Sequence, residues 1–222
     1  MDDQNIKEND TEPSSGRRQH AMDQRRRRII RAAGELIVQN DNGNFTMPEL
    51  AARASVSLAT PYNLFGSKAT ILSALFERQI KGFHNDNADL LTSQPADRVF
   101  ALVDRLVSAF ARDPQFFRNL WKALHSLGPL QYGQFPIPAT ARLLHPFVDS
   151  LGRDGHLPEA VSKHIIETTL FRIFNSLYEE WAIQDWSESQ LREELRASYA
   201  LVLHGFFKQP DRARLEQVIF TE

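Results

Sequence analysis

The sequence contains no cysteine, which excludes several kinds of site at once. A chain of 222 residues without cysteine has no disulfide framework, no thiolate nucleophile and no cysteine-ligated zinc. No apolar run approaches the ~20 residues that a helix needs to span a bilayer. The polar N-terminus also lacks the apolar segment of a secretory signal. We therefore expect a soluble, cytoplasmic protein.

Sequence motifs of enzymes are lacking too. The ten glycines are scattered over turns, with no G-x-S-x-G elbow, no glycine-rich phosphate loop and no H-E-x-x-H metal site. His164 and Glu167 are three residues apart, as two metal ligands on one helix could be, but such a pair is more often an ordinary polar helix face. We expect no catalytic residue, no metal site and no cofactor.

Strong net charge is absent overall, but the charge is unevenly distributed. The chain carries −2, with −4 over residues 1–16, +5 over residues 17–68 and −3 over the remainder. A local excess of Arg and Lys is what contact with nucleic-acid phosphates requires. The positive segment is therefore the place to look for a nucleic-acid interface.

Within that segment, Phe45–Lys68 has the pattern of two short helices joined by a tight turn. Thr46 and Glu49 form a T-x-x-E capping box at the start of the first helix. Ser57 is expected to cap a second helix over residues 58–65, and Ser67 a third. From these residues alone, a DNA-binding helix-turn-helix and an ordinary helical hairpin both remain open.

The second of these helices has a polar and an apolar side. Val56, Leu64 and Phe65 fit the inward side. The residues expected to face outward are Leu58, Ala59, Thr60, Tyr62 and Asn63.

The run V-S-L-A-T-P-Y-N-L-F-G-S-K at Val56–Lys68 resembles the TetR family of transcriptional regulators. That family has a pattern like V-S-x-x-T-x-Y-x-x-F-x-S-K at this place, and the resemblance extends over residues 25–83. Pro61 departs from the pattern, in which leucine is more frequent. Because proline has no N–H and disfavours helical geometry at the preceding residue, we expect an irregular start to the second helix.

The chain as a whole is predicted to be all-α, with no segment of strand-like alternation. We expect a disordered tail over residues 1–20, a three-helix DNA-binding domain over 21–68, and a larger helical ligand-binding and dimerisation domain over 69–222. Its helices are predicted at about 69–83, 96–111, 114–126, 138–151, 158–184 and 188–207.

In a DNA-binding helix-turn-helix, the residues of this segment would be candidates for two kinds of contact. Base-edge contact is expected from Leu58, Ala59, Thr60 and Asn63, and phosphate contact from Thr46, Ser57, Tyr62 and Lys68. Arg25, Arg26, Arg27 and Arg28 are either a solvated helix start or contacts to phosphate or the minor groove, and we favour the contacts.

In the C-terminal domain the last two predicted helices are apolar on more than one side. A helix of that kind is either buried in the core or paired with a partner. The resemblance implies that both pair with their twofold mates in a homodimer. It also implies a pocket for an amphipathic small molecule, for which the candidate residues are Phe117, Trp121, His125, Phe174 and Tyr178.

Together these features predict a homodimeric repressor that a small molecule releases from double-stranded operator DNA. A transcriptional activator or architectural DNA-binding protein would share the N-terminal domain without ligand release. A helical small-molecule-binding protein or enzyme is the third alternative, and it would have no affinity for duplex DNA.

Overall fold

The computed structural model describes residues 13–85, 94–128 and 137–220. In these ranges the regular structure consists of ten α-helices and no strand, which confirms the all-α prediction. The helices are α1 (Pro13–Gln39), α2 (Met47–Arg53), α3 (Ala59–Phe65), α4 (Lys68–Asn85), α5 (Pro95–Ala111), α6 (Pro114–His125), α8 (Ile137–Arg153), α9 (Lys163–Ile183), α10 (Glu188–His204) and α11 (Asp211–Ile219).

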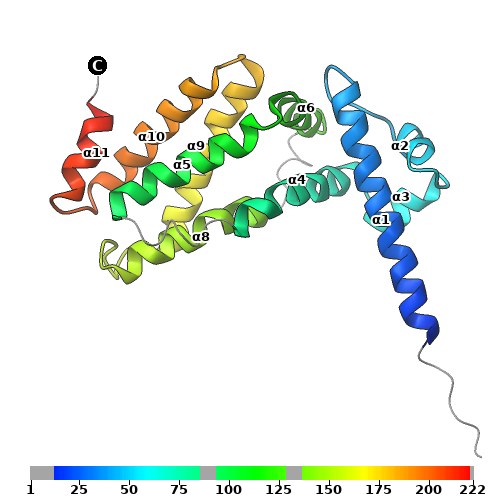
Figure 1. Ribbon diagram of the computed structural model, residues 1–222, viewed down its shortest axis with the longest axis horizontal. Helices are drawn as coiled ribbons and strands as arrows, with labels where there is room; N and C mark the ends of the chain where they lie inside the picture. Colours follow the sequence, from blue (N-terminus) through cyan, green and yellow to red (C-terminus); the bar gives the residue numbers. More distant parts are fainter. Residues whose placement is uncertain (1–12, 86–93, 129–136, 221–222) are drawn as a thin grey trace, which may run out of the picture.

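Helix α1 connects the two parts of the molecule. It packs against α2 on one side and against α4 and α6 on the other (Figure 1). Its buried side chains include Ile29, Ala33 and Ile37, which share one core with Leu50 of α2. The small N-terminal module of α1, α2 and α3 therefore rests directly on the larger domain.

The N-terminal half of α1 extends beyond this core. The prediction of a disordered tail over residues 1–20 is wrong for residues 13–20, which are helical, while residues 1–12 lie outside the described residues. The segment after Gly16 is rich in Arg, Gln, Ala and Met, which are good helix formers and continue the helix without tertiary support. From Gly16 onward, Ile29 is the first fully buried residue, and Figure 1 shows the N-terminal half of α1 projecting from the molecule.

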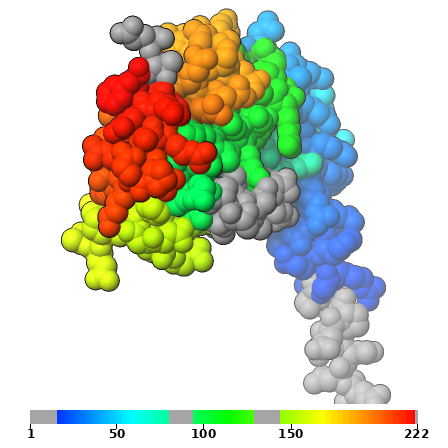
Figure 2. Space-filling model, turned by 60° about the vertical axis from the view of Figure 1, so that its left-hand side comes forward, coloured from blue at the N-terminus to red at the C-terminus, as the bar shows by residue number. Residues whose placement is uncertain are grey.

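The larger domain is built around α5, α9 and α10, which pack against one another or against shared neighbours. Phe110, Leu102, Leu170 and Tyr199 are among its fully buried side chains. The Tyr199 hydroxyl donates to the carbonyl oxygen of Leu170 at 3.0 Å, and burial raises the pKa of this phenol. Figure 2 shows α11 at the outer end of this domain, away from α1.

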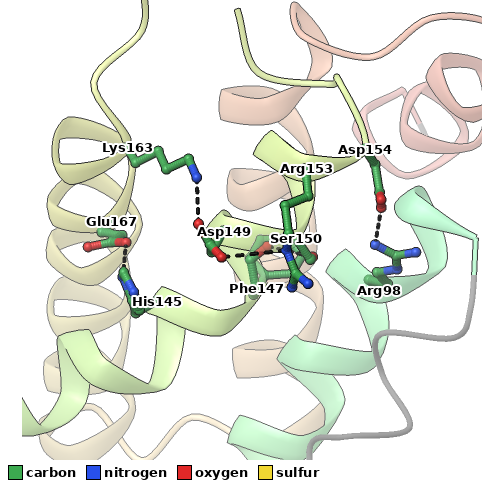
Figure 3. Close-up of polar contacts among 9 residues, drawn as sticks. All are labelled: Arg98, His145, Phe147, Asp149, Ser150, Arg153, Asp154, Lys163 and Glu167. Atoms are coloured by element: carbon green, nitrogen blue, oxygen red, sulfur yellow. Dashed lines mark hydrogen bonds and ion pairs between the residues drawn. The ribbon is translucent and has the colours of Figure 1, made fainter. Parts of the chain in front are cut away.

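Helix α8 is fastened to its neighbours by polar contacts at its surface. Figure 3 shows three such contacts, which are Lys163 with Asp149, His145 with Glu167, and Arg98 with Asp154. The Lys163 ammonium beside Asp149 lowers the pKa of that carboxyl group. These contacts join α8 to both α9 and α5.

The predicted helices differ most from the structure at α9, α10 and α11. Helix α10 ends at His204 rather than at 207. Helix α9 begins at Lys163 rather than 158, because residues 158–162 form turns after Pro158. Helix α11 was not predicted, since only Asp211 and Leu215 of its residues are buried and a single apolar anchor leaves no helical stripe in the sequence.

Candidate nucleic-acid interface

The start of α2 is fixed by the predicted capping box. The Glu49 carboxylate accepts from the Thr46 N–H at 2.7 Å, and the Thr46 hydroxyl accepts from the Glu49 N–H at 3.3 Å. The hydrogen bond from the Thr46 backbone lowers the pKa of Glu49. Phe45 and Leu50 on either side of the box are both buried. The capping box prediction is confirmed.

The turn into α3 differs from the prediction. Ser57 does not cap the helix through its side chain, because its hydroxyl bonds to the Thr60 hydroxyl at 2.8 Å and α3 begins at Ala59 with no side-chain cap. The Ser57 carbonyl accepts from the Thr60 N–H at 2.9 Å. Pro61 has no N–H and cannot donate the next helical hydrogen bond. Helix α3 therefore has the irregular start that the sequence predicted.

Helix α3 presents an exposed face with mixed chemistry. The side chains of Leu58 and Tyr62 are 52% and 47% exposed, and Ala59 and Asn63 are exposed as well. Thr60 is half-buried, and Pro61 is the residue of α3 that is buried. The outward set predicted from sequence is thus present, although Thr60 is partly withdrawn.

Lys68 lies in a different environment from the α3 face. Its ammonium group donates to the carbonyl oxygen of Phe45 at 2.6 Å and to the Asn44 side chain, and it lies 4.5 Å from the centre of the Phe45 ring. Burial lowers the pKa of Lys68. These contacts hold the segment before α2 against the start of α4, so Lys68 helps to shape the module.

Arg26 also differs from its neighbours in the arginine run. Its guanidinium donates to the carbonyl oxygen of Leu64 at 3.2 Å and lies 5.8 Å from the centre of the Phe65 ring. Arg26 therefore ties α1 to the C-terminal end of α3. Arg25, Arg27 and Arg28 are exposed on the same stretch of α1.

The candidate ligand residues form one aromatic cluster between α6 and α9. Trp121 and Phe174 each lie against Tyr178, with ring centres 4.9 Å and 5.6 Å apart, and the Tyr178 hydroxyl donates to the Phe117 carbonyl oxygen at 3.1 Å. These four side chains are buried. His125 is exposed at the edge, beside the Trp121 ring, and pairs with Glu179 at 2.7 Å.

Sequence reasoning missed the residue at the centre of this cluster. Phe110 of α5 is fully buried, and its ring centre lies 4.7 Å from that of Phe117 and 4.8 Å from that of Tyr178. Phe110 lies in the helix predicted at 96–111, but no sequence signal indicated which aromatic residues it would meet.

Glu167, which the sequence placed three residues after His164, has a histidine partner from another helix. Glu167 bonds to His145 at 2.7 Å, and among the side chains that the structure describes no group of three or more His, Asp or Glu could hold a metal ion. None of the described helices is long and apolar enough to cross a membrane.

The helix-turn-helix geometry agrees with a comparison against known families. Residues 29–75 match the family of bacterial regulatory proteins described as the tetR family. The chain carries a TetR-family DNA-binding domain. That domain comprises the core of α1, both helices of the helix-turn-helix and the first part of α4.

Solved structures of TetR-family regulators share the fold over most of the chain. A FadR repressor from Thermus thermophilus in complex with lauroyl-CoA is 24% identical, with 83% of this chain and 96% of that chain covered at a TM-score of 0.64. A TetR regulator from Rhodococcus sp. RHA1 is 20% identical, with coverage of 83% and 97% and a TM-score of 0.60. FadR from Bacillus subtilis in complex with stearoyl-CoA is 16% identical, with coverage of 87% and 97% and a TM-score of 0.57. No curated protein sequence matches the chain.

Proposed function

We propose that this chain is a homodimeric transcriptional repressor that binds operator DNA and is released from it by an amphipathic small molecule. The observation that carries the proposal is the exposed face of α3 in a TetR-family domain, because a helix of this kind can enter the major groove. Its apolar Leu58 and Ala59 suit thymine methyl groups, and Asn63 suits a base edge.

Phosphate contacts would place α3 in the groove. Tyr62 at the edge of the α3 face, together with Thr46 and Ser57 near the two helix starts, can donate to phosphate oxygens. Arg25, Arg27 and Arg28 supply the positive charge. Arg26 and Lys68 act first by fixing the module, since their charged groups already donate to carbonyl oxygens inside it. The hydroxyl groups of Ser57 and Thr60 bond to each other, and that of Thr46 bonds to Glu49, so contact with DNA would have to replace or share these bonds.

A single short recognition helix gives limited affinity, so the proposal requires two copies. Support comes from α9 and α10, where Ile165, Ile183 and Leu201 are 63%, 55% and 64% exposed. Ile165 and Ile183 lie near the two ends of α9, and Leu201 lies on the neighbouring α10. Large apolar side chains exposed along two neighbouring helices favour a partner. We assign that partner as the same pair of helices in a second copy.

The effector is proposed to bind at the α6–α9 aromatic cluster, with Phe117, Trp121, Phe174 and Tyr178 as walls and His125 at the rim. Two of the structural relatives hold acyl-CoA molecules, lauroyl-CoA and stearoyl-CoA. Long-chain acyl-CoA is therefore the first ligand class to test. A ligand that separates these rings would favour a conformer with lower DNA affinity.

The proposal is tested with a duplex selected from a random-sequence library by the wild-type protein. Fluorescence anisotropy should give a Kd that rises when lauroyl-CoA or stearoyl-CoA is added. Tight duplex binding that no acyl-CoA or other amphipathic ligand weakens would support an activator or architectural protein. Failure to select any duplex would overturn DNA binding itself.

A further inference from the structure

Helix α6 closes the C-terminal end of α1 with a side chain from outside the DNA-binding module. The Asn119 amide is fully buried and donates to the carbonyl oxygens of Ile37 and Asn40 at 2.9 and 3.0 Å. Carbonyl groups in the last turn of a helix have no partner within the helix. Gln115 donates to the Asn119 side-chain oxygen at 3.0 Å and so orients the amide. A residue of the larger domain thus holds the end of α1.

The backbone at this joint is also in close contact. Gly43, in the turn after α1, has a φ of +65°, and a Cβ at this position would lie 2.1 Å from the Asn119 carbonyl oxygen. A methyl group therefore does not fit between the turn and α6. Any shift of α6 at Asn119 must move the end of α1 or break these contacts.

The preceding residue of α6 points to a different partner. The Arg118 guanidinium donates to the Trp186 carbonyl oxygen at 2.8 Å, pairs with Asp185, and lies 4.6 Å from the centre of the Trp181 ring. Trp181 is near the end of α9, and Asp185 and Trp186 connect α9 to α10. Arg118 thus fixes α6 to the helices assigned above to the dimer.

The opposite flank of the joint is open. A cleft of about 450 Å³ lies between α1, α4 and α6, where Gly34, Leu75 and Phe116 contribute to the wall. The end of α1 is thus in close contact with α6 at Asn119, and an open cleft lies beside it where α1, α4 and α6 meet. Because α1 packs against α4 beside this cleft, a shift of α6 that moves the end of α1 must also change the contact between α1 and α4.

We propose that Arg118 and Asn119 are positioning residues that act in series. Arg118 couples the position of α6 to that of the α9–α10 pair, and Asn119 couples the position of α1 to that of α6. The two contacts together set the separation of the two recognition helices, the α3 helices of the dimer. Phe117 and Trp121 of the aromatic cluster flank this pair on the same helix, so a ligand at the cluster acts on both contacts. The inference rests on the proposed dimeric DNA-binding function.

If Arg118 and Asn119 act one after the other, the effects of replacing them should not add in a double-mutant cycle. Asn119→Leu and Arg118→Gln should each raise the Kd for the selected duplex about tenfold, within the usual range of coupling between sites. The double variant should bind no more weakly than the weaker single variant, because one broken contact already releases α1. Independent effects that multiply to about 100-fold would overturn the proposal.

Ser150→Ala is the matched control, because it removes one buried side-chain hydrogen bond, to the Phe147 carbonyl oxygen within α8, outside α1, α6 and the α9–α10 pair. It should lower thermal stability as the test variants do, with the Kd unchanged. If Asn119→Leu does not fold, Asn119→Ser provides the same cycle.

A direct readout uses the absence of cysteine from the chain. Ala52→Cys on the exposed side of α2 gives one spin label per module, so a dimer reports a single separation by pulsed electron paramagnetic resonance. Asn119→Leu and Arg118→Gln should broaden this distance distribution, and Ser150→Ala should leave it unchanged. A distribution that neither test variant alters would overturn the inference. If the two variants broaden the distribution relative to the wild type but the wild type binds no duplex, only the proposed function would be overturned.

Discussion

The DNA-binding module and the larger domain are held together by contacts of different range. In the module, the Thr46–Glu49 box and the bond from the Thr70 N–H to Ser67 join residues three positions apart. In the larger domain, Asp211 accepts from the Ala96 N–H across 115 positions. The longer contacts of the module, from Lys68 to Phe45 and from Arg26 to Leu64, span 23 and 38 positions, so those of the larger domain reach much further along the chain. The following predictions test this difference.

The largest effect is expected in the aromatic core of the larger domain. Phe110→Ala removes the ring at its centre and should lower the free energy of unfolding by about 3–5 kcal/mol. Chemical denaturation measures this change. Phe220→Ala, in which the ring is 73% exposed, is the control and should have little effect. Equal losses in the two variants would show that Phe110 does not organise the core.

The joint between the domains should be the next most sensitive place. Gly43→Ala forces a Cβ against the α6 backbone at a positive φ and should cost about 1–3 kcal/mol. Gly155→Ala has a similar φ of +75° and nothing within 4 Å, so it measures the conformational cost alone. If both variants lose the same stability, the contact between Gly43 and α6 is not tight.

Equivalent caps in the two domains allow a matched comparison. Thr46 and Ser187 each form a capping box, at α2 and at α10. Thr46→Ala and Ser187→Ala should each cost about 1 kcal/mol of unfolding free energy. Thr46→Ala should in addition weaken duplex binding, whereas Ser187→Ala should not. If the two variants bind the duplex with equal affinity, Thr46 does not contribute to the DNA interface.

The smallest effect concerns pH and the Lys163–Asp149 pair. Because Lys163 lowers the pKa of Asp149, this carboxylate stabilises the fold at pH values above its ordinary pKa of 3.8, and the contribution is lost as the pH falls below that value. The stability difference between wild type and Asp149→Asn should therefore shrink on acidification. A difference that is constant from pH 6 to about pH 3 would contradict the assignment.

The same difference in range explains what could be predicted from the sequence. The Thr46–Glu49 box and the outward face of α3 follow from residues within one or two turns of each other. The roles of Arg26 and Lys68 inside the module could not be predicted, because their partners Leu64 and Phe45 lie 38 and 23 positions away. Asn119 gave no signal at all, since its partners belong to a helix about 80 positions earlier. Helix α11 escaped prediction because it depends on packing against α5 and α10.

The central claim, that this module binds duplex DNA through α3 and an arginine-bearing α1, is tested most directly by the salt dependence of the Kd for the selected duplex. The wild type should show a steep decrease in log affinity with log salt concentration. Replacing Arg25, Arg27 and Arg28 with Ala should reduce the slope by up to about 3, since each phosphate contact contributes about 0.9. A slope that these three substitutions leave unchanged, or the absence of salt-dependent duplex affinity in the wild type, would contradict the account.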